Sequence, residues 1–408
     1  MRILFTVYGS RPHIYPLVPL AWALRSVGHE VRLASTPSWA DDLTHTGLPA
    51  VTVGGSPQVS RAERDALAGT IYYQPKPWRV DWATHIDRLD REQWDYLEAA
   101  GRYLSAAADA MTDDLIGFAR DWGPDAVVYD THSYAGAVAA AAVGVPGVSH
   151  RNGPDAGLRF EVIQPGLEPL PEYAALFERH GLAVPADPPA TVDPTPPSMR
   201  VVSPPGMLGM RHISFNGPGI MPDGLTGPRP RPRVLVTWGH SISEGIGAAG
   251  AVPFHQAVEA VAELGLDCLL AVPPVEVERL GTLPGHARAL ASVPLQLVLP
   301  HCDAIIHQGG YGSALTAAAA GIPQLVIASY PETDMCAARL VAVGAGLHLR
   351  VPDLRADLDS RATIRDAVAT LLFSTGYADG ARRLRADIES QPAPAEVATR
   401  LLALITTG

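Results

Sequence analysis

The stretch that decides the fold runs from His307 to Gln324 and reads HQGGYGSALTAAAAGIPQ. An apolar run at 303–306 precedes it and predicts a buried strand. The alanine-rich part after the glycines predicts a helix that is closed by Gly321 and Pro323. Glycines between a strand and a helix let the backbone approach a ligand closely, and the helix start offers free N–H groups to an anion. With a histidine at the strand end, the pattern predicts a diphosphate-binding turn.

Strands and helices alternate along both halves of the chain. Residues 2–7 predict a strand, 17–27 a helix, and 30–35 and 50–53 two further strands. A buried strand at 125–129 is followed by an alanine-rich helix and by Gly-Val-Pro, the same order that surrounds the opening stretch. This alternation indicates the α/β class, with parallel sheets covered by helices on both faces. The repeated order indicates two similar domains.

Prolines accumulate between about residues 185 and 232, which predicts an extended surface connector because proline interrupts helices. We therefore place an N-terminal domain at 1–210 and a proline-rich linker at 211–232. A second domain follows at 233–390, and a final helical segment occupies 391–408.

Composition limits the classes of function. A chain of 408 residues is long enough for two domains with cores of their own, and 47% hydrophobic against 18% charged residues indicates a soluble globular protein. The net charge of −11 argues against nucleic-acid and anionic membrane partners, so an anionic ligand must be held by local N–H groups. Three scattered cysteines offer neither a metal-ligand spacing nor a disulfide framework. Without a signal segment or a membrane-spanning run, we expect a cytoplasmic protein.

The opening stretch resembles the nucleotide-sugar signature of the family 1 glycosyltransferases, in which a His-x-Gly-Gly-x-Gly-Ser/Thr turn grips the donor diphosphate. Further matches to that family are 2–6, His13, 17–24, 28–31, Asp334, 338–339 and 344–346. The segments at 193–198, 216–218 and 233–237 resemble the bacterial branch that attaches deoxysugars to antibiotics. The resemblance covers nearly the whole chain and is weakest between about 55 and 120.

This resemblance implies a GT-B fold, with two Rossmann-like domains whose parallel sheets face a central cleft. The N-terminal domain would bind the acceptor and the domain at 233–390 the nucleotide sugar. The last helix would cross back to the first domain.

His13 matches the general base of the family. It lies between the first predicted strand and the first predicted helix, where open parallel sheets bind ligands, and a histidine there can accept a proton from an acceptor hydroxyl. Asp130, at the end of the strand at 125–129, matches the partner aspartate that would hold the imidazole. The alternatives are that His13 packs against its helix and that Asp130 caps the helix after it. His132 is a weaker candidate for the base.

The resemblance also implies a set of donor contacts. They are Gly239, Ser241, Val293, His307, Gly309, Gly310, Gly312, Ser313, Asp334 and Met335. Leu315 stands where plant members carry a glutamate for both ribose hydroxyls, which favours a TDP donor because thymidine lacks the 2′-hydroxyl. Met335 replaces a glutamine that holds glucose hydroxyls, which favours a deoxysugar, unless it is packing filler. His240 replaces a small residue and would either reach the diphosphate or point into solvent.

Aromatic residues gather in the least familiar region of the chain. Trp78, Trp82 and Trp94 are the tryptophans of this group, and flat rings suit a hydrophobic acceptor. The alternative is that they fill the core of amphipathic helices. We expect core packing for single rings and acceptor binding for the region as a whole.

These features predict an inverting, metal-independent glycosyltransferase without a cofactor. His13, assisted by Asp130, would deprotonate a hydrophobic small-molecule aglycone, while His307 and the N–H groups of 309–313 stabilise the departing TDP. No Asp-x-Asp pair suitable for a metal-bound nucleotide stands in a plausible loop. The expected partners are the TDP-sugar and the aglycone, with neither nucleic acid nor membrane.

Other readings stay open at this stage. A sugar-nucleotide epimerase on the same fold would also bind the diphosphate but would need no aglycone pocket. A non-catalytic relative could act as an auxiliary subunit. A homodimer and a cytochrome-like helper protein are open as further partners.

Overall fold

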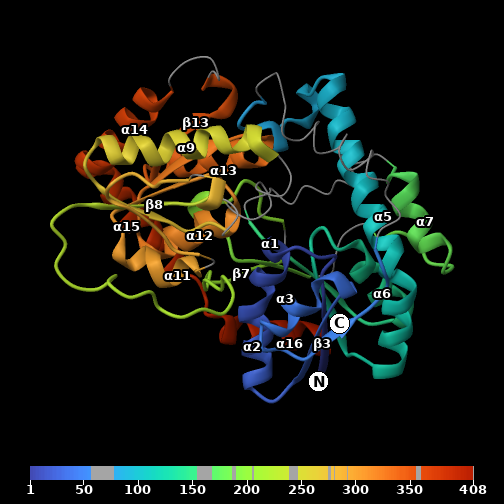
Figure 1. Cartoon of the computed structure of the whole chain (residues 1–408). Helices are drawn as coiled ribbons and strands as arrows, with labels where there is room; N and C mark the ends of the chain where they lie inside the picture. Colours follow the sequence, from blue (N-terminus) through green and yellow to red (C-terminus); the bar gives the residue numbers. More distant parts are fainter. Residues whose placement is uncertain are drawn as a thin grey trace.

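Two parallel sheets form the frame of the molecule. The computed structural model describes residues 1–56, 78–153, 168–185, 190–204, 206–238, 247–273, 277–279, 281–291, 293–354 and 360–407. The first sheet has the strand order β3-β2-β1-β4-β5-β6-β7 and the second the order β10-β9-β8-β11-β12-β13. Figure 1 shows the first sheet and its helices in blue to green, and the second in yellow to red. The α/β class and the GT-B arrangement expected from the sequence are confirmed.

The first sheet is built from strands that all pair in parallel. They are β1 (Arg2–Thr6), β2 (Glu30–Ser35), β3 (Ala50–Thr52), β4 (Ala126–Asp130), β5 (Gly147–His150), β6 (Ala190–Asp193) and β7 (Met207–Gly209). The helices of this half are α1 (Arg11–Ile14), α2 (Val18–Ser26), α3 (Ala40–Thr44), α5 (Arg91–Trp122), α6 (Tyr134–Val143) and α7 (Pro171–Glu178). The helix predicted at 17–27 is thus preceded by a separate short helix, α1, in a segment broken by prolines.

The second sheet is also parallel throughout. Its strands are β8 (Arg233–Val236), β9 (Asp267–Leu270), β10 (Ala287–Ala289), β11 (Ala304–His307), β12 (Gln324–Ala328) and β13 (Gly346–Arg350). Its helices are α9 (Gly247–Glu263), α11 (Leu295–Val298), α12 (Tyr311–Ala320), α13 (Pro331–Ala342), α14 (Arg361–Phe373) and α15 (Thr375–Ser390), followed by α16 (Pro394–Thr407). Short 3-10 turns lie at Tyr15–Leu17, Pro37–Trp39, Trp82–Thr84, Ile86–Arg88, Pro197–Met199, Leu299–His301 and Val351–Asp353.

Helix α5 is a single helix of 32 residues in the region where the resemblance is weakest. Asp90 accepts a hydrogen bond from the Gln93 N–H and the Gln93 side chain accepts from the Asp90 N–H, which satisfies two donors at the helix start. The helix ends at Gly123, whose φ of 65° suits the left-handed cap that glycine adopts without strain. Its buried face packs on α6 and α7.

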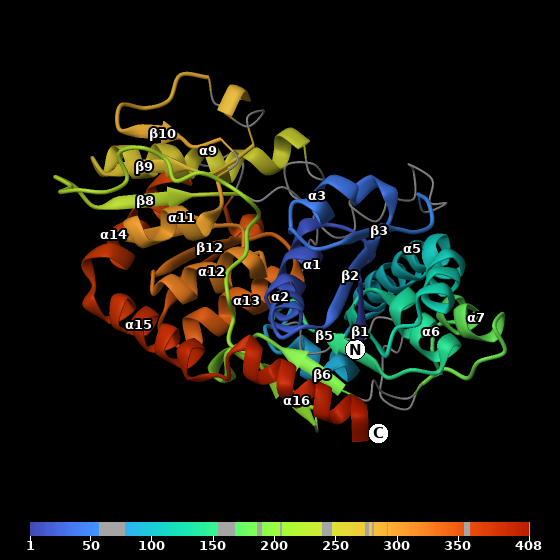
Figure 2. The same cartoon turned by 90° about the horizontal axis from the view of Figure 1, so that it is seen from below.

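The last helix, α16, lies on the N-terminal half. Its residues Val397 and Leu401 belong to the same core cluster as Leu20 and Leu24 of α2. Figure 2 shows α16 reaching past β6, and both views place the two chain ends close together. Just before it, the Gln391 side chain donates hydrogen bonds to carbonyls next to β6 and β7. The domain boundaries at 210, 232 and 390 stay predictions.

Within the described part of the chain, no helix is long and apolar enough to cross a membrane.

The packing of α16 on α2 predicts that buried residues of α16 contribute to the free energy of unfolding. Leu401 is 0% exposed, so Leu401→Ala should lower the free energy of unfolding by about 2–5 kcal/mol. Leu404 on the same helix is 47% exposed, and the matched change Leu404→Ala should stay within about 0.5 kcal/mol. Urea titration followed by circular dichroism measures both, and equal effects of the two changes would contradict the docking of α16.

Candidate active site

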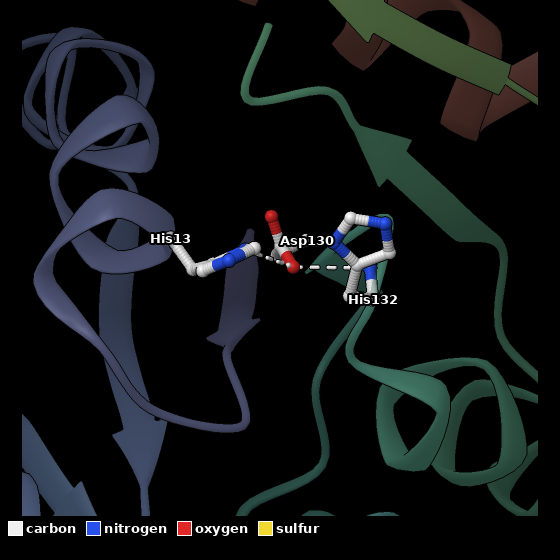
Figure 3. Close-up of side chains that lie close together, drawn as sticks. All are labelled: His13, Asp130 and His132. Carbon is white, nitrogen blue, oxygen red and sulfur yellow. Dashed lines mark hydrogen bonds and ion pairs between the residues drawn. The ribbon is translucent and has the colours of Figure 1, made fainter. Parts of the chain in front are cut away.

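A histidine and an aspartate meet at the carboxyl ends of two neighbouring strands. His13 lies in α1, just after β1, and Asp130 is the last residue of β4, which pairs with β1. The His13 Nδ1 atom lies 3.0 Å from Asp130 Oδ1, and the side chains are 14% and 1% exposed. Figure 3 shows the carboxylate of Asp130 between the side chains of His13 and His132. The two residues that the sequence singled out for proton transfer are therefore in contact.

The contact with Asp130 favours one tautomer of His13. Burial alone would raise the pKa of Asp130, but the charge and hydrogen bond of His13, with the His132 N–H at 3.0 Å, bring this pKa below its usual value. An ionised carboxylate only accepts hydrogen bonds, so His13 carries its proton on Nδ1. Its Nε2 then keeps a lone pair for an incoming proton.

Asn152 is a third member of this group that sequence reasoning missed. It follows β5, the strand beside β4, and its Nδ2 atom lies 2.9 Å from His13 Nδ1. A protonated Nδ1 favours the opposite orientation of this amide, with the oxygen toward the ring. The sequence analysis predicted no strand at β5, so no strand end marked Asn152 as a candidate.

His132 is partly buried beside the pair, with its ring centroid 5.3 Å from that of His13. Burial lowers the pKa of His132 to about 4, so its ring is neutral near pH 7. Ligand atoms of His13, Asp130 and His132 all lie within 4.8 Å of one another, and these three side chains could hold a metal ion. The independence from metal ions stays a prediction.

The glycine turn lies at the end of β11, as the sequence predicts. A Cβ on Gly309, whose φ is +94°, would come within 2.8 Å of Thr333 and 2.9 Å of Val326, so only glycine fits there. The first helical hydrogen bond of α12 runs from Ala314 N–H to the Gly310 carbonyl. The N–H groups of Gly312 and Ser313 precede it and therefore have no acceptor within the helix. This helix start is suited to an anion.

His307 occupies a different position from the one expected. It is 0% exposed, its Nε2 lies 2.9 Å from Gln324 Oε1, and its Nδ1 accepts the Gly309 N–H at 3.0 Å. Burial lowers its pKa to about 4, so the ring is neutral. In this structure neither ring nitrogen is left for a diphosphate, because both bind neighbouring protein groups.

Gln308, which the sequence reasoning passed over, is buried next to the turn. Its Oε1 has no hydrogen-bond partner among the described residues. It is a better candidate than His307 for a side-chain contact to the donor. The signal was its place between the histidine and the first glycine.

Leu315 points into the protein interior. It is 1% exposed and belongs to a core cluster with Val326 and Leu340. The next residue, Thr316, contacts the Asn216 side chain, which in turn accepts the Gln296 N–H. Leu315 is thus a core side chain that makes no contact of its own to a nucleotide, and the argument for thymidine from the missing glutamate stays a prediction.

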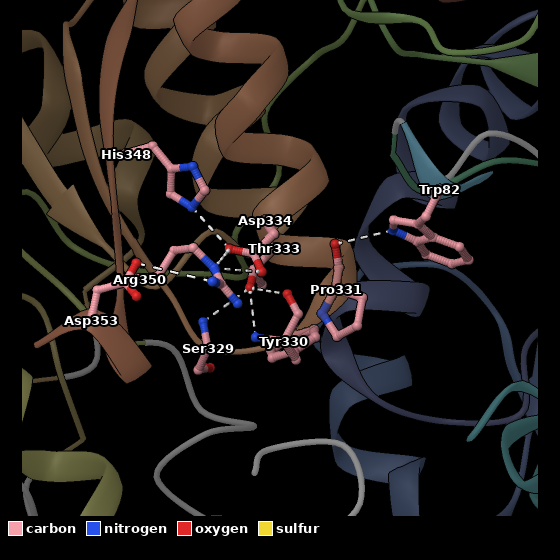
Figure 4. A network of polar contacts seen from close by, with 9 residues as sticks. All are labelled: Trp82, Ser329, Tyr330, Pro331, Thr333, Asp334, His348, Arg350 and Asp353. Carbon is pink, nitrogen blue, oxygen red and sulfur yellow. Dashed lines mark hydrogen bonds and ion pairs between the residues drawn. The ribbon is translucent and has the colours of Figure 1, made fainter. Parts of the chain in front are cut away.

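Asp334 and Met335 also face inward. The Asp334 carboxylate lies 2.9 Å from His348 Nε2 and 3.3 Å from Arg350 Nε, both on β13. Figure 4 shows this network, with Trp82 on the opposite side of Pro331. Met335 is 0% exposed. The structure supports the packing interpretation of Met335, and the Asp334 carboxylate binds the side chains of His348 and Arg350.

The tryptophans of the acceptor region are largely core residues. Trp78 is 4% and Trp82 0% exposed, and their rings meet edge to face at 4.8 Å. The Trp82 Nε1–H donates to the Pro331 carbonyl at 3.4 Å, and Tyr96 donates to Glu332 at 2.9 Å. This segment thus joins the N-terminal half to the start of α13. Trp94 is only partly buried.

The remaining donor candidates divide into two groups. Val293 is partly buried beside α11 and packs on the core of the second sheet. Gly239, His240 and Ser241 lie outside the described residues.

Comparisons with known proteins agree on one group of relatives. Two family models match, the N-terminal domain of erythromycin biosynthesis protein CIII-like proteins at 22–239 and their C-terminal domain at 255–404. The 10-deoxymethynolide desosaminyltransferase of Streptomyces venezuelae is 34% identical, over 98% of this chain and 96% of that protein. The crystal structure of the glycosyltransferase VinC in complex with DTDP matches with a TM-score of 0.80 and 31% identity, over 100% of both chains. The spinosyn rhamnosyltransferase SpnG complexed with thymidine diphosphate has a TM-score of 0.80 and 27% identity, over 99% of this chain and 100% of that one.

Because Asp334 is buried and pairs with Arg350, removing its charge should destabilise the protein more than the same change at the exposed Asp353. Asp334→Asn removes a 7% exposed carboxylate from its cation and should lower the free energy of unfolding by about 3 kcal/mol. Asp353 contacts the same Arg350 at 4.0 Å but is 68% exposed, so Asp353→Asn should cost less than about 1 kcal/mol. Equal losses in chemical denaturation would show that burial does not govern this network.

Proposed function

Because the chain belongs to the erythromycin biosynthesis protein CIII-like family, we propose that it transfers a deoxysugar from a TDP-sugar to a natural-product aglycone, with inversion and with His13 as general base. The chain is a glycosyltransferase of the GT-B fold. The observation that carries the proposed mechanism is the contact between His13 and Asp130.

In the proposed reaction, His13 Nε2 takes the proton of an acceptor hydroxyl. The freed oxygen attacks the anomeric carbon from the face opposite the diphosphate, so a new carbon–oxygen bond forms as the bond to the phosphate oxygen breaks. The configuration at that carbon is inverted. Asp130 stabilises the imidazolium that results, because its buried, ionised carboxylate accepts a hydrogen bond from the Nδ1–H group.

The start of α12 supports the proposed diphosphate site. Its N–H groups, together with the helix dipole, attract an anion that the net charge of −11 would otherwise repel. These groups would stabilise the charge that develops on TDP as it leaves, so we propose that no metal ion is required.

The donor class rests on relatives. VinC and SpnG were crystallised with thymidine diphosphate, and the Streptomyces venezuelae protein is named for transfer of desosamine to 10-deoxymethynolide. Neither Leu315 nor Met335 adds support for this donor class, because both are core residues.

No observation on the described residues favours an epimerase or a non-catalytic subunit. A homodimer and a helper protein stay predictions.

The donor assignment predicts the order of nucleotide affinities. TDP should raise the melting temperature more than UDP or GDP at equal concentration. At about a hundred times its dissociation constant, a ligand adds roughly 2.7 kcal/mol to the free energy of unfolding. Differential scanning fluorimetry with the three nucleotides measures this order, and equal or larger stabilisation by UDP would refute the thymidine assignment.

The base assignment predicts a loss of turnover without a loss of donor affinity. His13→Ala should lower kcat about a hundred- to ten-thousand-fold with a screened aliphatic alcohol acceptor, while the TDP dissociation constant stays near that of the parent. Asp130→Asn should act in the same direction, and the two losses should not add if the pair works as a unit.

The exposed His45 provides the control, since His45→Ala should leave both kcat and TDP affinity unchanged. Near-normal kcat of His13→Ala at neutral pH would remove this residue from the mechanism. A product that keeps the anomeric configuration of the donor would refute the inversion.

A further inference from the structure

Gln324 ties together three segments that surround the glycine turn. It is the first residue of β12 and is 0% exposed. Its Oε1 lies 2.9 Å from His307 Nε2 at the end of β11, and its Nε2 donates to the Ala314 carbonyl in the first turns of α12 at 3.1 Å. Both contacts are buried, so water does not compete for them.

Only one arrangement of protons satisfies the hydrogen bonds that link Gly309, His307, Gln324 and Ala314. The Gly309 N–H can only donate, so the His307 Nδ1 that receives it is unprotonated. A neutral imidazole then carries its hydrogen on Nε2, which donates to Gln324 Oε1. The Ala314 carbonyl can only accept, which requires the Gln324 nitrogen on its side. The Gly309 N–H and the Ala314 carbonyl, at the two ends of this series of hydrogen bonds, therefore require the same orientation of the Gln324 amide and the same tautomer of His307.

A charged His307 would break this arrangement. An imidazolium carries a proton on Nδ1 as well, and that proton would face the Gly309 N–H, donor against donor. Burial favours the neutral ring for the same residue, since the site is closed to water. His307 thus acts on the turn through a lone pair and not through charge.

The turn has little freedom to compensate. Gly309 sits against Thr333 and Val326 so closely that even a Cβ would collide. The direction of its N–H is fixed by His307, and the N–H groups of Gly312 and Ser313 follow within one helical turn. A change in the His307 tautomer would turn the Gly309 peptide and with it the start of α12.

We propose that Gln324 is a positioning residue of the donor site: it holds His307 as the Nε2–H tautomer and so keeps the glycine turn in the shape that presents N–H groups to the diphosphate. The assignment of the diphosphate to this turn rests on the proposed function. His307 contributes to donor binding through the Gly309 backbone, without touching the phosphates.

The first test is a double-mutant cycle on TDP affinity, measured by isothermal titration calorimetry on the full chain. Gln324→Leu removes both hydrogen bonds and should weaken TDP binding about tenfold. His307→Leu should weaken it at least as much, and the double variant should be no worse than His307→Leu alone. His307→Asn keeps an acceptor near the Nδ1 position and should recover part of the loss. Additive losses, or parental affinity in Gln324→Leu, would overturn the proposal.

The second test reads the tautomer itself, and it needs no substitution in the parent protein. Long-range 1H–15N spectra of histidine-labelled protein should show His307 as the Nε2–H form, unchanged between about pH 5.5 and 8.5 and unchanged by TDP. In Gln324→Glu the added carboxylate should bring His307 into titration within that range. An Nδ1–H tautomer in the parent, or a titrating His307, would overturn the proposal even if Gln324→Leu fails to fold.

The outcomes separate this inference from the proposed function. If the parent protein does not bind TDP, the proposed donor is wrong, while the spectra still decide the tautomer of His307. If the parent binds TDP and Gln324→Leu binds it equally well, the donor stands and the role of Gln324 is wrong.

Discussion

The parallel pairing of β1 with β4 is the constraint on which the site depends. The pairing sets Thr6 opposite Tyr129, so both strands end at the same edge of the sheet. Residues that are 117 positions apart in the chain, His13 and Asp130, can then meet at 3.0 Å. Antiparallel pairing would send the two ends to opposite edges. The catalytic contact is therefore a consequence of sheet topology before it is one of side-chain chemistry.

Parallel strand pairing in the second sheet likewise positions the glycine turn of the proposed donor site. β11 lies between β8 and β12 and pairs with both in parallel, so the chain returns from the end of β11 to the start of β12 through the crossover helix α12. Burial then determines which polar side chains support this turn. The side chains of His307 and Gln324 form hydrogen bonds with protein groups, whereas the Gln308 Oε1 has no hydrogen-bond partner among the described residues. A buried polar group without a partner is costly, which is why it marks a contact to be completed by a ligand.

Contacts between the two halves bring the two sites into one region. The Trp82 and Tyr96 side chains of the N-terminal half donate to Pro331 and Glu332 at the start of α13. On the other side of the site, Gly153 lies so close to the Tyr311 ring that a Cβ would approach to 2.2 Å. The loop that carries Asn152 therefore touches the helix start that carries the turn. Burial raises the pKa of Glu332, as expected where two packed halves exclude water.

The sequence by itself determined the α/β class, the two parallel sheets and the residues that end strands, because these features depend on local periodicity and on glycine and proline. It also singled out Asp130, directly after a predicted strand, and His13, between the first predicted strand and the first predicted helix. It did not determine where side chains on a helix point. Leu315 and Thr316 are neighbours in an apolar stretch, yet one fills the core and the other contacts Asn216. The inward direction of Asp334 and the role of Gln324 were likewise decided by partners from β13, β11 and α12. These partners lie 10 to 17 residues away on other elements. Only tertiary packing determines which face of a helix and which end of a side chain they meet.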